Sequence, residues 1–556
     1  MKRFFLLFSF LFLQSVLFSQ NLPLFDKVKT SLPAILSQNN QIAYVNTPYV
    51  FSNTEIHLID AKGTQRFLYE SKEVKIKSNL IPLNDKWYFL SSSADYTADK
   101  VEYQIVELNN RAEFLFQKEV MSCEEKLGEN HFYGVVNYTT KMPFAANLYA
   151  SNNQKYILSV ASKLIGFAGL SFNPEMGAQL SNGISYADDY ANYSHTHTLQ
   201  SQGVNNFKDY DQSEEVCHFS LMDTKLNVLT KGSYSFGVKR DKIRSLSAHV
   251  DDDGNIFLIL DVRQEFVGKT NRIIIVKIGN KSVAEERIEL NLDVFNANGV
   301  KHFIEGNKLS FVGFVCKEED EGKGLSGVFY SRVNLNDMKI QEKNVSLFDS
   351  SEVLMINKMY EYEFKPVNPA DGKVMKSPHA DNKLVKEKDI SRALITPFFC
   401  QSIELLGDSS CLIAMQFRSY WDQLGYNESY CSKIIVLRID ELGKKKSAIY
   451  QFGEAEKNTF VRGMSFLKND NNVSLIFNGS FSKAPMATYQ ADFNVFSLEK
   501  PLPRVLSEFK KGKKTLVYRQ SSMPSYIKNN FLIYVVESKN ANAYFQKHYL
   551  SVFTLK

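Results

Sequence analysis

The sequence lacks the paired cysteines of a zinc or thiol–disulfide motif. Its six cysteines are scattered over 556 residues without a C-x-x-C spacing: Cys123, Cys217, Cys316, Cys400, Cys411 and Cys431. An excess of one charge is also missing, because 66 lysines and arginines stand against 61 aspartates and glutamates. No basic stripe with interleaved aromatic residues occurs, so we expect no nucleic-acid partner.

Long apolar runs are absent after the first twenty residues. Within those twenty, Lys2 and Arg3 precede the mostly apolar Phe4–Leu13, and Ser19 is a small residue at a plausible cleavage point. This apolar run is shorter than the roughly 20 residues that a bilayer requires. Residues 1–20 therefore predict a secretory signal peptide, with an uncleaved anchor as the alternative. We expect residues 21–556 to be exported, periplasmic or extracellular, and without a membrane span.

Familiar catalytic motifs are missing too. Searches for G-x-S-x-G, H-E-x-x-H and S-x-x-K in a plausible context find no credible match, and no glycine-rich phosphate loop occurs. A site assembled from single residues far apart in the chain would leave no such motif. We therefore favour a binding protein over an enzyme and leave enzymatic activity open.

The sequence does contain a repeated unit, which is clearest over Leu246–Ile278. The tight-turn sequence Asp251–Asn255 is followed by the short, β-branched apolar run Ile256–Leu260, and Ile273–Ile278 follows a polar loop. This pattern predicts strand, turn, strand, loop and strand. Polar dipeptides recur at the same place in the first hairpin of other copies: Asn39-Asn40, Asn84-Asp85, Asn152-Asn153, Gly254-Asn255, Gly306-Asn307, Asp470-Asn471 and Asn529-Asn530.

Repeated four-stranded units that cannot bury both faces alone predict an all-β fold, a β-propeller. We expect about eight (seven to eight) antiparallel blades in one domain over 21–556. The last copy stops after three strands, so Leu24–Thr30 is the candidate to supply the outer strand and close the ring. Two smaller β-domains or a β-sandwich array are the alternatives.

The chain resembles secreted bacterial β-propellers of unknown function, and the resemblance is architectural. With only Trp87 and Trp421, tryptophan-based blade signatures are excluded, and no other named subfamily signature is present. The resemblance therefore implies no functional residues.

Two insertions interrupt the repeats, at about 166–215 and 351–392. Long irregular segments inside a compact domain are usually functional or mobile. In the first, His195 and His197 would lie on one side of an extended segment, shortly after Asp188 and Asp189. Imidazoles and carboxylates are ligands for zinc and other divalent metals, so these four residues are a candidate metal site. Solvated loop histidines are the alternative, and no other cofactor is predicted.

The same insertion is rich in tyrosine, which provides contact area at a low entropic cost. The candidate ligand-binding residues are Tyr186, Tyr190, Tyr193, His195, His197 and Tyr210. They favour a binding or scaffold protein that recognises a protein or glycan partner through its inter-strand loops. The alternative is a propeller hydrolase or lyase, acting on glycans or peptides at the central channel.

Two further features have structural interpretations. The run Asp251–Asp253 lacks the alternating ligands and the distal Glu of a calcium loop, so we interpret it as a turn. Cys400, Cys411 and Cys431 are close in sequence and could contain a disulfide in an exported protein, with burial as small apolar residues as the alternative.

Overall fold

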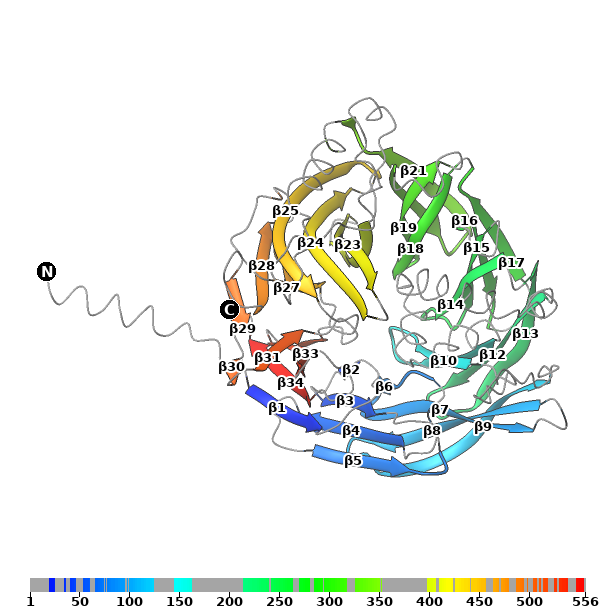
Figure 1. Cartoon of the computed structure of the whole chain (residues 1–556). Coiled ribbons are helices and arrows are strands. Elements are labelled where there is room, and N and C mark those ends of the chain that lie inside the picture. Colours follow the sequence, from blue (N-terminus) through cyan, green and yellow to red (C-terminus); the bar gives the residue numbers. More distant parts are fainter. Residues whose placement is uncertain are drawn as a thin grey trace, which may run out of the picture.

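The computed structural model arranges the chain as a ring of seven antiparallel sheets (Figure 1). One of them has eight strands and makes up two blades, so the β-propeller has eight blades. It describes residues between 20 and 554, except for 26–34, 125–144, 163–213, 353–397, 457–463, 480–486, 539–546 and shorter gaps between strands. The predicted all-β propeller is confirmed. No helix of the described residues is long and apolar enough to cross a membrane.

Blades one to seven each use four strands that follow one another in sequence from the centre of the ring outwards (Figure 1). Blades one and two contain β2 (Ile35–Leu36), β3 (Gln41–Asn46), β4 (Thr54–Asp60) and β5 (Arg66–Ser71), then β6 (Ile81–Leu83), β7 (Lys86–Asp95), β8 (Lys100–Asn109) and β9 (Phe114–Glu124). Blades three and four contain β10 (Ala145–Ala150), β11 (Tyr156–Ser162), β12 (Glu214–Asp223) and β13 (Val228–Lys239), then β14 (Ile243–Val250), β15 (Ile256–Arg263), β16 (Thr270–Ile278) and β17 (Glu285–Asn291).

The next three blades repeat this order. Blade five contains β18 (Phe295–Glu305), β19 (Lys308–Lys317), β20 (Gly327–Asn334) and β21 (Lys339–Leu347). Blade six contains β22 (Phe398–Leu405), β23 (Cys411–Gln423), β24 (Tyr426–Ile439) and β25 (Lys445–Glu456). Blade seven contains β26 (Met464–Asn469), β27 (Asn472–Gly479), β28 (Ala487–Asn494) and β29 (Arg504–Ser507).

Blade eight is built from both ends of the chain. Its inner and middle strands are β30 (Lys510–Lys511), β31 (Lys514–Tyr518), β32 (Ser525–Ile527), β33 (Asn530–Ser538) and β34 (Lys547–Thr554). The outer strand is β1 (Gln20–Phe25), which pairs antiparallel with β34 from Gln20 opposite Val552 to Phe25 opposite His548. The N-terminal segment supplies the outer strand, as predicted. The strand spans Gln20–Phe25, a few residues earlier than the predicted Leu24–Thr30.

The connections divide between two faces of the ring. Because neighbouring strands are antiparallel, the first-to-second and third-to-fourth turns of each blade share one face, the turn face. The second-to-third connections and those between blades share the other, the long-connection face. The three longest connections, 125–144, 163–213 and 348–397, all belong to the long-connection face. The three longest connections therefore leave and rejoin their strands at the same face.

Some strands are apolar at every position because they are covered on both sides by neighbouring blades. We call the interface between two neighbouring blades a seam. In β15, Ile256, Leu258 and Leu260 join the core shared by blades three and four. The alternate residues Phe257 and Ile259 join the core shared by blades four and five. Because side chains of a strand alternate between faces, a strand covered on both sides is apolar at every position. Similar seams join blades one to two and two to three.

The turn at Asp251–Asn255 is structural, as predicted. The Asp251 carboxylate accepts hydrogen bonds from the backbone N–H groups of Asp253 (3.0 Å) and Asn255 (2.8 Å). Asp and Asn begin turns of the same kind in the outer hairpins, with equivalent bonds at Asn109, Asp223 and Asp440. These outer turns form a second repeated feature that the inspection of the sequence missed.

A carbonyl in each of five outer turns accepts a hydrogen bond from the blade before it. The donors belong to blades one to five, and the acceptors belong to blades two to six. The pairs are Gln41–Asn110 (2.5 Å), Lys118–Leu226 (2.8 Å), Thr230–Asn280 (2.7 Å), Lys277–Asn336 (3.1 Å) and Asn344–Leu442 (2.7 Å). We call these contacts the turn latches, because they fix each turn to its neighbour.

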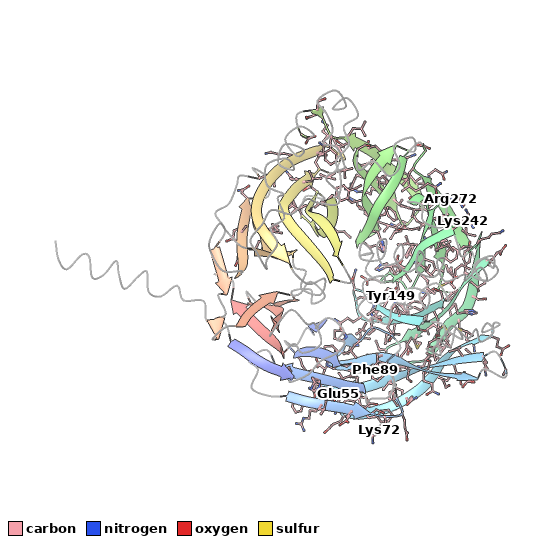
Figure 2. The ribbon with its side chains drawn as sticks, in the orientation of Figure 1. Glu55, Lys72, Phe89, Tyr149, Lys242 and Arg272 are labelled. Carbon is pink, nitrogen blue, oxygen red and sulfur yellow. The ribbon has the colours of Figure 1, made fainter. Side chains whose placement is uncertain are left out.

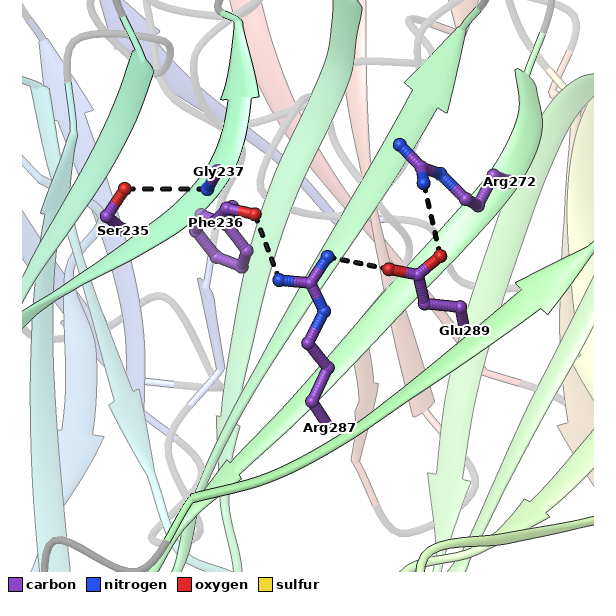
Figure 3. Close-up of polar contacts among 6 residues, drawn as sticks. All are labelled: Ser235, Phe236, Gly237, Arg272, Arg287 and Glu289. Carbon is purple, nitrogen blue, oxygen red and sulfur yellow. Dashed lines mark hydrogen bonds and ion pairs between the residues drawn. The ribbon is translucent and has the colours of Figure 1, made fainter.

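A charged cluster joins blades three and four at the outer wall (Figure 3). Arg287 donates to the Phe236 carbonyl (3.0 Å) and to Glu289 (2.6 Å), which also accepts from Arg272 (3.1 Å). Partial burial acts to raise the pKa of Glu289. The hydrogen bond from Arg287 and the two positive charges outweigh it and hold the pKa below its usual value.

We expect Glu289→Gln to lower the free energy of unfolding by about 0.5–1 kcal/mol, since the cluster is a third exposed. The contribution of Glu289 is present above its unfolded-state pKa and is lost as the pH falls through the lower folded-state value. Thermal unfolding of both proteins between pH 7 and 3 would measure this. Glu286→Gln on the same strand is the control, because Glu286 is 53% exposed and lies 4.0 Å from Lys277. Equal effects of the two substitutions would contradict the prediction.

Three cysteines lie in the interior of the blades. Cys123, Cys217 and Cys411 are buried and form no disulfide, so for Cys411 the structure agrees with burial as a small apolar residue, the alternative to a disulfide. Cys400 lies on β22 and Cys431 on β24, with β23 between them. Two strand spacings amount to about 9–10 Å, which exceeds the Cα separation that a disulfide can bridge.

Candidate functional site

The residues predicted for ligand and metal binding lie outside the described residues. They are Tyr186, Asp188, Asp189, Tyr190, Tyr193, His195, His197 and Tyr210. Their segment, 163–213, connects β11 to β12 and therefore leaves blade three at the long-connection face. The metal site and the tyrosine-rich binding surface stay predictions. Among the residues that are described, no group of three or more His, Cys, Asp or Glu is arranged to hold a metal.

The second insertion also belongs to the long-connection face, between β21 and β22. The chain that leads into this insertion is fixed by hydrogen bonds and an ion pair. Asp349 and Glu352 each accept a hydrogen bond from the other's backbone N–H (2.8 and 2.9 Å), the capping box that begins a helical turn. Glu352 also forms an ion pair with Lys445 of β25, and both side chains are largely buried. The insertion is thus attached to blade six where it leaves blade five.

On the turn face, hydrogen bonds join the inner turns of blades two, three and four. The backbone N–H of Asn84 donates to the Gln154 side chain (3.3 Å), which joins blades two and three. Asn153 donates to Asp252 twice, to its carboxylate (2.7 Å) and to its carbonyl (2.8 Å), which joins blades three and four. Together with the turn latches farther out, these bonds connect neighbouring blades through described polar groups of the turn face.

Polar residues interrupt the apolar pattern on the innermost strands of blades three to five. β10 carries Asn147 and Tyr149, β14 carries Ser247 and His249, and β18 carries His302. Figure 2 shows Tyr149 on the inner side of the ring. We call these five residues the inner polar group.

Two members of the inner polar group lie between blades three and four. Asn147 is 4% exposed, and its side-chain nitrogen has no hydrogen-bond partner among the described residues. Burial raises the pKa of Tyr149 to about 12, although Asn147 and the backbone of Ala248 partly offset the effect. A buried amide nitrogen without a partner is unusual, because leaving a donor unsatisfied costs about 1–3 kcal/mol.

The other three members meet between blades four and five. The Ser247 hydroxyl and the Nε2 atom of His302 are 3.2 Å apart, a hydrogen bond whose direction depends on the histidine tautomer. Burial, together with a smaller effect of the neighbouring His249, lowers the pKa of His302 to about 4. Burial also lowers the pKa of His249, against the opposing charges of Asp251 and Asp252. Both imidazoles are therefore neutral at pH 7.

This arrangement suits hydrogen bonding better than proton transfer. A general base is most effective with a pKa near the working pH, and the pKa of His302 lies well below that. In addition, no described carboxylate hydrogen-bonds His302, so the Ser247–His302 pair lacks the third group that orients a catalytic histidine. The inner polar group thus offers neutral donors and acceptors beside aromatic rings.

The sequence held a signal for this group that the hairpin pattern obscured. Asn147 and Tyr149 precede the turn residue Ser151 by four and two positions, as Ser247 and His249 precede Asp251. His249 and His302 each stand opposite a phenylalanine of the next strand, Phe257 and Phe311, with ring centroids 6.2 and 6.1 Å apart. Aligning the units on their turns would have brought these positions together.

Comparison with known proteins adds little beyond the fold. No protein-family model matches the sequence, and no curated protein matches it. Solved structures of similar shape include the polysaccharide lyase Uly1, with 8% identity over 97% of this chain and 99% of that chain and a TM-score of 0.39. The β-propeller domain of the Trilobed protease from Pyrococcus furiosus is 9% identical over 86% of this chain and 99% of that chain, with a TM-score of 0.34. Virginiamycin B lyase from Staphylococcus aureus is 10% identical over 83% of this chain and 96% of that chain, with a TM-score of 0.31. At these distances nothing about ligand or activity is transferred.

Proposed function

We propose that this eight-bladed propeller is an exported binding protein that holds a glycan partner at its long-connection face. The observation that carries the proposal is the division between faces: the three longest connections share one face, whereas tight, hydrogen-bonded turns occupy the other. Binding residues are commonly placed on loops that a rigid scaffold positions. A ring whose blades are joined by hydrogen bonds at the turn face is such a scaffold.

A glycan is preferred to a protein because of the chemistry at the inner strands. Asn147, Tyr149, Ser247 and the two neutral imidazoles offer uncharged donors and acceptors. Such groups suit a ligand rich in hydroxyls. The tyrosines of 163–213 would add aromatic contact area at the long-connection face. The alternative, hydrolysis or elimination at the central channel, has less support, since the serine–histidine pair found among the described residues has a weakly basic imidazole.

A loop replacement tests the proposal. The full mature chain, a variant with residues 166–212 replaced by a short Gly-Ser linker, and the turn-face control Arg111→Ala/Lys225→Ala would be applied to arrays of neutral and acidic polysaccharides. We expect the wild type and the control to bind the same polysaccharide, and the linker variant to lose at least tenfold in affinity. Equal binding by all three proteins would contradict the role of the long-connection face. Absence of binding to every polysaccharide would contradict a glycan partner.

A further inference from the structure

The seam between blades four and five contains two imidazoles at its inner end. His249 lies on β14 and His302 on β18, the innermost strands of the two blades. Both are partly buried, each beside a phenylalanine, and Ser247 links His302 to β14 by a 3.2 Å hydrogen bond. The two rings are close enough for the charge of one to affect the other. Histidine is the side chain whose charge ordinarily changes between pH 5 and 8.

Protonated His302 would have no described carboxylate bonded to it. Its described hydrogen-bond partner is the neutral Ser247 hydroxyl, and Phe311 stands opposite on β19. The described acidic groups on the neighbouring strands have other places: Asp251 and Asp252 act on His249, Glu305 stands opposite Lys308, and Asp261 stands opposite Ser245. The side chains of β22, the inner strand of the next blade, are not described. A positive charge on His302 would therefore face His249 rather than a counter-ion.

We propose that the inner end of the seam between blades four and five is an acid-sensitive joint, which loosens when His249 and His302 become protonated. The ring would then be weakest at one defined seam in acid. This inference concerns the fold and does not rest on the proposed glycan binding.

Acid favours opening of the seam because the pKa of His302 differs between the closed and open forms. In the closed seam burial holds the pKa of His302 at about 4, whereas in an opened seam the imidazole regains a pKa near 6.5. Below pH 6.5 the open form takes up the proton first, so acid favours opening. From pH 7 to pH 4.5 this difference multiplies the opening equilibrium by about 10²-fold for His302 alone, and His249 acts in the same direction.

Hydrogen exchange on the full chain tests the joint. Protection factors of the amides in β14 and β18 would be measured at pH 7 and pH 4.5, corrected for intrinsic exchange and compared with those of β8. We expect β14 and β18 to lose about 10²-fold more protection than β8 in the wild type. The double variant His249→Gln/His302→Gln should lose no more than β8. If a glutamine variant is misfolded at pH 7, His302→Leu alone should still remove most of the effect.

The control is His57→Gln in blade one. His57 is 3% exposed, but its Nε2 atom is 3.1 Å from the Glu55 carboxylate, so its charged form has a counter-ion. This variant should keep the acid response of β14 and β18. Uniform loss of protection around the ring in the wild type would overturn the proposal. So would an acid response of β14 and β18 that persists in the double variant.

Discussion

Trp87→Ala is expected to lower the free energy of unfolding by about 3–5 kcal/mol, the usual cost of removing a buried aromatic ring. Trp87 lies on β7, is 1% exposed, and belongs to the core shared by blades one and two. Its indole nitrogen donates to the Gln41 side-chain oxygen (2.9 Å), and the Gln41 nitrogen donates to the Asn110 carbonyl (2.5 Å). Removing the indole would therefore leave a cavity and loosen the first turn latch.

Trp87→Phe separates these two contributions. Phenylalanine keeps most of the apolar volume but lacks the indole N–H, so we expect a smaller loss of about 1–2 kcal/mol. Urea unfolding followed by circular dichroism would rank the three proteins by their midpoints. An alanine variant with the wild-type midpoint would contradict the placement of Trp87 at the centre of the seam.

Gly443→Ala is expected to cost about 2–5 kcal/mol, the sum of two effects. Gly443 has a φ of +76° in the outer turn of blade six, a conformation that an alanine adopts only with strain. A Cβ atom at this position would also lie 2.7 Å from the Cβ atom of Asn344, the residue of blade five whose side chain bonds the Leu442 carbonyl. The substitution would therefore push the two blades apart at their turn latch.

Gly306→Ala is the matched control, because Gly306 also has a positive φ (+58°) in a turn but has open space where its Cβ atom would be. The variant should lose only the free energy of unfolding that backbone strain costs, about 1–2 kcal/mol. Thermal unfolding midpoints of the two variants would give the difference. Combining Gly443→Ala with Asn344→Gly should recover part of the loss if the collision is its cause. Equal midpoints for the two single variants would show that the latch tolerates the extra atom.

The fold was largely predictable because its determinants are local and repeated. A short apolar run such as Ile256–Leu260, preceded by a turn sequence, specifies a buried strand wherever it occurs. The missing outer strand of the last unit indicated closure by the N-terminal segment, and β1 supplies it with an offset of a few residues. The sequence left a disulfide and burial open for the cysteines of blade six, because closeness in sequence says nothing about which strands separate two cysteines.

The site was much less predictable. The insertions could be recognised as interruptions, but their shared face follows from the alternation of strand direction around the ring. Asn147 and Ser247 looked like ordinary strand residues, since polar positions are common in half-exposed strands. Their burial becomes visible only when the neighbouring blade is in place.

The amino-acid sequence determined the strands, their turns and the propeller class, because each depends on residues close together in the chain. The tertiary structure decided which groups meet across the seams: Ser247 and His302 are 55 positions apart, and Asn344 and Leu442 are 98 apart. Contacts at such separations depend on how one blade is seated on the next. The packing of one blade on the next depends on the shape of the whole apolar seam rather than on any local sequence pattern.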